Sequence, residues 1–106
     1  MEPFTEKAIH IIQAVPPGKV MTYGQVARQA GSPRGARQIA RLLHSMSAKH
    51  KLPWHRIVNA QGKIVVADEE SRYTQRALLE GEGVEIGRNG QIDLEVYRHD
   101  CTDPST

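Results

Sequence analysis

Apolar residues recur along the start of the chain at the spacing of an amphipathic helix. They stand three or four positions apart, which places them on one face of a helix over residues 5–15. The residues on this face are Phe4, Ala8, Ile9, Ile12 and Val15. The run Pro16-Pro17-Gly18 follows, and a proline pair before a glycine cannot continue a helix. The pattern therefore predicts a first helix that ends before residue 16.

A capping box predicts the start of a second helix. Thr22 and Gln25 stand three residues apart, so each side chain can bond to the backbone N–H of the other residue. The helix is expected over residues 23–30. Gly31 follows it at the position where a residue in the left-handed conformation typically ends a helix.

Ser32 and Pro33 indicate a third helix, with serine as the N-cap and proline at the first helical position. Its apolar positions continue to about residue 45, and its polar residues are Arg34, Arg37, Gln38 and Arg41. Two helices joined by a tight turn that contains glycine are the sequence form of a helix-turn-helix.

The middle of the chain is expected to contain a loop and a β-hairpin. Residues 47–52 are polar and basic, which is typical of a loop. The β-prone runs at residues 57–58 and 63–66 flank a turn at residues 59–62, and this arrangement predicts a hairpin.

A fourth helix is expected from about residue 71 to residues 81–83. Residues 84–86 and 92–97 are expected to pair as a ribbon, and the tail from about residue 100 is expected to fray. The prediction is therefore a single domain over residues 1–106, mainly α with a small β-hairpin, of the winged-helix or helix-turn-helix type.

Size and composition restrict the class of protein. A chain of 106 residues, 39% hydrophobic and 25% charged, is typical of one small globular domain. No apolar run is long enough to span a membrane, and residues 1–3 show no secretory signal. Cys101 is the one cysteine, which excludes an internal disulfide and a CxxC zinc site. The five histidines show no metal-ligand spacing, so neither metal nor cofactor is expected, and the expected location is the cytoplasm.

Charge is distributed very unevenly. No Asp or Glu occurs between residues 7 and 67, whereas residues 68–106 hold ten acids and four arginines. The cations of the first stretch are Lys7, Lys19, Arg28, Arg34, Arg37, Arg41, Lys49, Lys51, Arg56 and Lys63. An acid-free block of this length favours a nucleic-acid partner, and the alternative is a basic face that aids solubility.

The run Pro53-Trp54-His55-Arg56-Ile57-Val58 resembles the Pro-Cys-His-Arg-Val signature of O6-alkylguanine-DNA alkyltransferases. Three other blocks, at residues 17–24, 31–40 and 79–84, are similar to further segments of that family. The order and spacing agree over residues 4–86 and match the C-terminal domain of those proteins. In the family the cysteine is the nucleophile, and Trp54 stands at its position here. An indole is a poor nucleophile whose N–H only donates hydrogen bonds.

The resemblance therefore implies an alkyltransferase-like protein, not an enzyme, that binds and flips O6-alkylguanine in duplex DNA without alkyl transfer. It also implies a monomer that needs no membrane, hands the lesion to nucleotide excision repair proteins and associates with the nucleoid when bound to DNA. The residues it places on DNA are Thr22, Tyr23, Ser32, Pro33, Arg34, Gly35, Ala36, Arg37, Gln38 and Arg41.

Individual roles follow from the same resemblance. Tyr23 would rotate the nucleotide out of the duplex, and Arg37 would enter the stack in its place. Tyr23, Trp54 and Ile57 would line the lesion pocket. His55 and Glu82 match the catalytic relay of the family and, with no thiol to activate, are interpreted as structural relics. The alternative for Trp54 is a core plug that closes a dead pocket.

The sequence departs from the family pattern in two places, and two other functions are open alternatives. Residues 65–72 replace a Tyr-x-Gly-Gly-like run that shapes the family's pocket, and Met46 stands where the family has a hinge asparagine. The main rival is a small winged-helix transcriptional regulator with a specific operator. An enzyme such as a glycosylase or endonuclease would need an acid or a lysine beside the flipped base, and Glu82 is the only candidate in a matched block.

Overall fold

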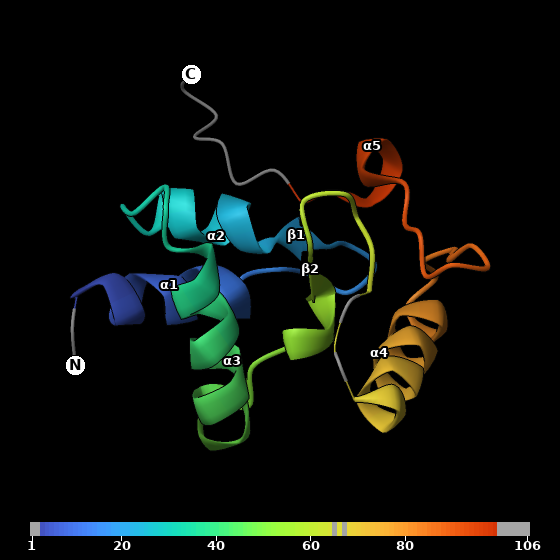
Figure 1. The fold of residues 1–106 in the computed structure, drawn as a ribbon, viewed down its shortest axis with the longest axis horizontal. Coiled ribbons are helices and arrows are strands. Elements are labelled where there is room, and N and C mark those ends of the chain that lie inside the picture. The colour runs from blue at the N-terminus through green and yellow to red at the C-terminus, as the bar shows by residue number, and fades with distance from the viewer. Residues whose placement is uncertain (1–2, 65, 67, 100–106) are drawn as a thin grey trace.

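Figure 1 shows a computed structural model in which α1, α2 and α3 pack at one end and α4 and α5 lie at the other. The structure describes residues 3–64, 66 and 68–99. Its helices are α1 (Pro3–Gln13), α2 (Tyr23–Gln29), α3 (Ala36–His50), the 3₁₀ helix η1 (Trp54–Arg56), α4 (Glu69–Gly81) and α5 (Leu94–Tyr97). The strands are β1 (Met21–Thr22) and β2 (Ile57–Val58). In these ranges no helix has the length and apolar character needed to cross a bilayer.

The two strands lie between the helical ends and pair in parallel, with Met21 opposite Ile57 and Thr22 opposite Val58. The small β element is confirmed, but the expected hairpin is wrong. Ile57 and Val58 are both buried, at 0% and 1% exposure, so neither face of the strand is left to solvent. Strands buried on both faces are typical of parallel pairing, whereas hairpins commonly keep one solvated face.

The expected turn at residues 59–62 does form, and among the described residues after it none belongs to a strand paired with β2. The Asn59 carboxamide oxygen accepts hydrogen bonds from the backbone N–H groups of Gln61 (3.0 Å) and Lys63 (2.8 Å). Lys63 then forms an antiparallel bridge with Gln91. Residues 65 and 67, part of the run expected as the second hairpin strand, lie outside the described residues.

Two clusters of buried side chains lie on either side of the strand pair. The larger cluster joins α1, α2 and α3 and includes Ile12, Ile39 and Ile57, each at 0% exposure. The smaller cluster is formed by Val20, Val58, Leu79, Val84 and Ile92. Strand β2 contributes one residue to each cluster, so it lies at the junction of the two.

The capping box that predicted α2 is confirmed. The Thr22 hydroxyl oxygen accepts a hydrogen bond from the Gln25 N–H at 3.0 Å, and the Gln25 side chain accepts one from the Thr22 N–H at 3.3 Å. Gly31 has a φ of 102°, in the left-handed region expected after this helix. The helix itself ends at Gln29, one residue before the expected end.

The third helix differs from its prediction at both ends. Helix α3 begins at Ala36 with Gly35 as its N-cap, while Ser32 closes a preceding turn by accepting a hydrogen bond from the Gly35 N–H at 2.9 Å. The expected start at Ser32 and Pro33 is therefore wrong. The turn brings Gly35 against α1, where a Cβ would lie 3.0 Å from the Phe4 ring and 3.1 Å from the Ser32 carbonyl oxygen.

The expected loop at residues 47–52 is also wrong over most of its length, because α3 continues to His50. The Ser45 and Ser47 hydroxyls donate hydrogen bonds to the carbonyl oxygens of Arg41 and Leu43, one turn back. Met46 packs against the larger cluster. Tertiary packing and these local bonds hold a polar run in a helix.

The C-terminal part forms a short helix instead of the expected ribbon. A turn does close at Gly87, whose N–H donates to the Gln91 carbonyl at 2.9 Å. Asp93 then caps α5, its carboxylate accepting from the Glu95 N–H at 3.0 Å, and this cap directs residues 94–97 into a helix. Asp68 likewise caps α4, which begins at Glu69, two residues before the expected start. The tail at residues 100–106 lies outside the described residues.

Lys51 ends α3 in the left-handed conformation, at φ 51° and ψ 47°, which disfavours a side chain with a Cβ. We expect Lys51→Gly to raise the free energy of unfolding by about 0.5–1 kcal/mol. The matched control is Lys49→Gly, an exposed position within the same last turn, where glycine should lower that free energy by about 1 kcal/mol. Chemical denaturation of both variants tests this, and destabilisation by Lys51→Gly would contradict it.

Candidate nucleic-acid interface

A cavity of about 500 Å³ lies between α3, α4 and η1. It is lined by Tyr23, Ala40, Leu43, His44, Ser47, Trp54, Val66, Ser71 and Gln75. Tyr23 and Trp54, two of the three residues expected in a lesion pocket, therefore share one cavity. Trp54 is half-buried: it lines this cavity and also packs against the larger buried cluster.

Ile57, the third expected pocket residue, does not reach the cavity. Its exposure is 0%, and it packs in the larger buried cluster. Its backbone pairs with Met21 across the parallel strands, so the side chain is committed to the core. The expectation that Ile57 touches a bound base is therefore wrong for this structure.

Tyr23 is the first residue of α2, directly after the capping threonine, so the capping box fixes the position of its backbone. The side chain is partly buried and packs against the larger cluster. Burial raises the pKa of the Tyr23 hydroxyl, since an ionised phenolate would lose its hydration. The hydroxyl is consequently protonated near neutral pH and available as a hydrogen-bond donor.

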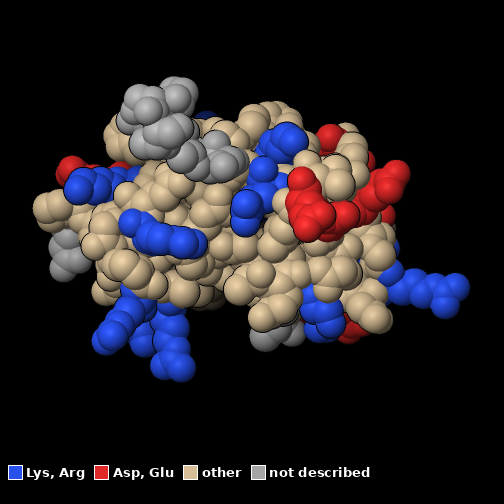
Figure 2. All heavy atoms as spheres, turned by 90° about the horizontal axis from the view of Figure 1, so that it is seen from above, with Lys and Arg blue, Asp and Glu red and all other residues tan. Residues whose placement is uncertain are grey.

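Arg37 and Arg41 lie one turn apart on the exposed side of α3, and Arg34 lies in the turn before it. Ala40 and His44 on the same helix line the cavity, so the cationic side of α3 adjoins it. Within the described ranges, none of these three arginines forms an ion pair with an acid. Figure 2 shows several Lys and Arg side chains projecting from the α1–α3 end and a group of Asp and Glu side chains at the α4 and α5 end, where basic side chains also project.

The other residues expected on DNA differ in exposure. Pro33 and Gln38 are exposed, and Ser32 and Ala36 are half-buried. Gly35 is buried against Phe4. The packing of Gly35 against α1 therefore explains why glycine stands at this position. Close approach of DNA is not needed to explain it.

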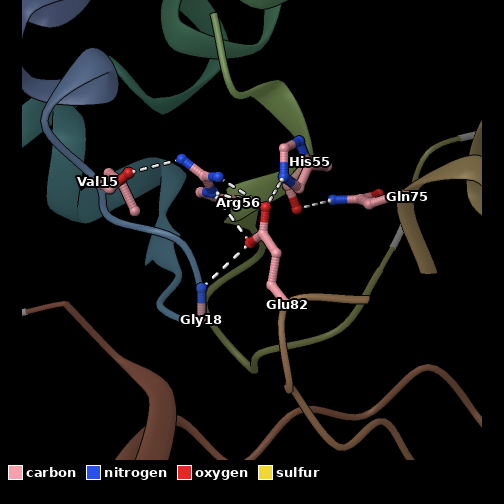
Figure 3. Close-up of polar contacts among 6 residues, drawn as sticks. All are labelled: Val15, Gly18, His55, Arg56, Gln75 and Glu82. Atoms are coloured by element: carbon pink, nitrogen blue, oxygen red, sulfur yellow. Dashed lines mark hydrogen bonds and ion pairs between the residues drawn. The ribbon is translucent and has the colours of Figure 1, made fainter. Parts of the chain in front are cut away.

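The carboxylate of Glu82, which directly follows α4, is the centre of a polar network (Figure 3). His55 Nε2 lies 2.8 Å from Glu82 Oε2. Arg56 donates to the same carboxylate from Nε (3.0 Å) and Nη2 (2.6 Å), and from Nη1 to the Val15 carbonyl oxygen at 2.9 Å. The Gly18 N–H donates to Glu82 Oε1 at 3.2 Å. His55 and Glu82, expected to form a structural pair, are thus brought together.

The network keeps Glu82 ionised. Burial of the carboxylate favours its neutral form, but hydrogen bonds from Arg56, His55 and Gly18 outweigh this cost and lower the pKa to about 2. A carboxylate with this pKa is a weak base near neutral pH. Glu82 is also absent from the lining of the cavity, so it does not serve the glycosylase-type chemistry considered above.

Gln75 on α4 is a site residue that the sequence did not reveal. Its side chain is 1% exposed and donates hydrogen bonds to the backbone oxygens of His55 (3.0 Å) and Ile57 (3.1 Å), the first of which is drawn in Figure 3. It thereby joins α4 to the segment that carries Trp54. The available signal was a polar residue four positions before Leu79, on the apolar side of the helix.

These observations define a helix-turn-helix domain with a cavity beside its second helix. A family model for the DNA-binding domain of 6-O-methylguanine DNA methyltransferases matches residues 3–84, and the chain belongs to this family. The DNA base-flipping protein of Escherichia coli is 44% identical over 95 residues, which cover 90% of this chain and 73% of that protein.

Two further comparisons are with a protein and a crystal structure from Schizosaccharomyces pombe. Alkyltransferase-like protein 1 of Schizosaccharomyces pombe is 38% identical over 87 residues, or 81% of each chain. The crystal structure of S. pombe Atl1 in complex with damaged DNA containing O6-carboxymethylguanine superimposes with a TM-score of 0.84. That structural match is 33% identical and covers 94% of this chain and 97% of the other. The expected family and fold class are confirmed.

We expect Glu82→Gln to lower the free energy of unfolding at pH 7 by about 2–3 kcal/mol, because Arg56 would lose its charged partner in a half-buried site. Glu80→Gln is the matched control. Its carboxylate is 48% exposed and lies 3.5 Å from Arg76, and its loss should cost less than about 0.5 kcal/mol. Equal effects of the two substitutions would contradict the prediction.

The pH dependence follows from the lowered pKa of Glu82. The carboxylate titrates near pH 4.5 when unfolded and near pH 2 when folded, so its stabilisation is fully present above pH 4.5. It is lost as the pH falls from about 4.5 to 2, where the folded form must bind a proton. Denaturation at several pH values should show this loss in the wild type and a smaller one in Glu82→Gln.

Proposed function

We propose that this protein is a sensor of DNA damage, not an enzyme, that binds and flips O6-alkylguanine in duplex DNA without transferring the alkyl group. The observation that carries the proposal is the cavity shared by Tyr23 and Trp54 beside the cationic side of α3. The family and the relatives named above support it, since one relative is a base-flipping protein and another was crystallised with DNA containing an alkylated guanine.

Trp54 is the reason for excluding alkyl transfer. It stands where the alkyltransferase signature has its cysteine, and the chain's one cysteine, Cys101, belongs to no motif of that signature. Alkyl transfer requires a nucleophile that attacks the alkyl carbon, and an indole N–H supplies only a hydrogen-bond donor. Its flat apolar face is suited to packing against a purine ring or an alkyl group.

The roles proposed for Tyr23 and the three arginines follow from their positions around the cavity. Tyr23 would crowd the backbone of the target nucleotide and assist its extrusion, which costs a few kcal/mol and less for a base whose pairing is already disturbed. Arg37 would fill the space left in the stack, because a planar guanidinium can stack and donate hydrogen bonds together. Arg34 and Arg41 would contact phosphates and hold the duplex in register.

A sensor without chemistry acts through a later partner. We propose that the protein acts as a monomer in the cytoplasm, at the nucleoid, and passes the lesion to nucleotide excision repair proteins. The acidic side chains gathered at the α4 and α5 end (Figure 2) would offer a surface for that contact. A winged-helix transcriptional regulator is less well supported, since operator recognition gives no role to a cavity of about 500 Å³ next to Tyr23.

The direct test compares two duplexes that are identical except for one O6-methylguanine. We expect binding tighter by about tenfold or more on the alkylated duplex, because the disturbed pair is flipped at lower cost. Mass analysis of the recovered DNA should find the methyl group still present, with an active alkyltransferase as the positive control. Equal affinity for both duplexes would favour the transcriptional regulator, and loss of the methyl group would refute the role given to Trp54.

Two arginine variants separate flipping from electrostatic docking. Arg37→Ala should weaken binding to the alkylated duplex by about 10- to 100-fold, and by less on the unmodified duplex. Arg41→Ala should weaken both by a similar factor and reduce the salt dependence by about one counterion. Fluorescence titration over a range of salt concentrations measures both effects. Identical behaviour of the two variants would show that Arg37 is only a phosphate contact.

A further inference from the structure

The orientation of the Gln75 carboxamide is determined by its surroundings. Its nitrogen donates to two backbone carbonyl oxygens, those of His55 and Ile57, at 3.0 and 3.1 Å. Carbonyl oxygens only accept hydrogen bonds, so the amide cannot be flipped without facing oxygen against oxygen. The side-chain oxygen Oε1 must therefore point away from the η1–β2 segment.

That oxygen has no hydrogen-bond partner although it is buried. The residue is 1% exposed and belongs to the lining of the cavity. A buried polar atom without a partner is rare in proteins and destabilising, and such atoms are often satisfied by a ligand or a bound water. Gln75 and Trp54 line the same cavity, so the free oxygen belongs to a residue of the wall that Trp54 also forms.

The two serines that line the cavity already donate their hydroxyl hydrogens to other groups of the protein. The Ser71 hydroxyl donates to Asp68 Oδ2 at 2.7 Å, and the Ser47 hydroxyl donates to the Leu43 carbonyl oxygen at 2.5 Å. Only oxygen lone pairs remain on Ser47, Ser71 and Gln75 for a bound group. This part of the wall accepts hydrogen bonds, while the lining donors are Tyr23, His44 and Trp54.

We propose that Gln75 Oε1 accepts a hydrogen bond from the O6 substituent of the bound guanine, so that the cavity favours substituents that end in a donor, such as 2-hydroxyethyl. The inference rests on the proposed function and adds a substrate preference to it. Because Oε1 has almost no exposed surface in the free protein, the wall must open by a side-chain movement, and the new hydrogen bond would favour that movement.

The alternative is a cavity that responds only to size and apolar area. Such a cavity would bind a propyl group more tightly than the equally long 2-hydroxyethyl group, because the hydroxyl would be buried without a partner. The two substituents each have three non-hydrogen atoms beyond O6. The ratio of their dissociation constants therefore reports on the acceptor and is insensitive to chain length.

The experiment measures the affinity of the wild type and of Gln75→Met for three duplexes, unmodified, O6-propylguanine and O6-(2-hydroxyethyl)guanine. Methionine keeps the length and about the volume but removes the acceptor, together with the two hydrogen bonds that the Gln75 nitrogen donates to the His55 and Ile57 carbonyl oxygens. We expect the wild type to bind the hydroxyethyl duplex at least as tightly as the propyl duplex, and Gln75→Met to shift the ratio toward propyl by about tenfold. The matched control is Gln29→Met, an exposed position outside this cavity, which should leave the ratio unchanged.

Each outcome decides the inference. A tighter complex of the wild type with propyl, or the same ratio in the wild type and Gln75→Met, would overturn it. The ratio of the two dissociation constants is taken within each protein, so a general loss of affinity in Gln75→Met cancels. If that variant does not fold, the ratio measured for the wild type decides. If neither alkylated duplex is bound more tightly than the unmodified one, the proposed function itself fails, which is a different result.

Discussion

The arrangement of the site depends on one half-buried carboxylate. Glu82 follows α4, yet it accepts hydrogen bonds from Gly18, which precedes β1, and from His55 and Arg56 of η1. Arg56 extends the network to the carbonyl oxygen of Val15 after α1. Segments far apart in the sequence thus meet at one negative charge, and Trp54 is held beside the cavity because the two residues that follow it are tied to that charge.

This network gives His55 and Glu82 a reason to be present that requires no catalysis. In an alkyltransferase the resemblance assigns this pair to activation of the thiol, but here both side chains hold η1 against the end of α4. A low pKa of about 2 suits a permanent anchor for Arg56 and is far from the value expected of a base working near neutral pH. The same geometry can therefore serve structure alone once the nucleophile is replaced.

Local signals predicted the elements whose ends are defined by side-chain chemistry. The capping box of α2 and the turn at Asn59 formed as expected, because each depends on residues only a few positions apart. The shared cavity of Tyr23 and Trp54 followed from the family signature. The start of α3 was mispredicted because packing of Gly35 against Phe4 outweighed the capping preference of Ser32, a contact between distant residues.

The other incorrect or absent predictions also involve contacts between residues that are distant in the sequence. The partner of β2 lies more than thirty residues earlier, so the pattern around residues 57–58 contained no sign of it. The burial of Ile57 depends on that pairing. Gln75 is recognisable only when its two carbonyl acceptors are seen, since a single glutamine in a helix is ordinary in a sequence.

The short parallel pair has a mechanical consequence. Tyr23 directly follows β1, and Trp54 is the first residue of η1, which leads into β2. The backbone pairing of β1 with β2 therefore connects the segment that carries Tyr23 to the segment that carries Trp54. Tyr23 and Trp54 are therefore parts of one rigid unit. Because the two backbones are held together, distortion on binding falls mainly on the DNA. The ease with which each damaged base pair opens then adds to the preference that the O6 substituent sets inside the cavity.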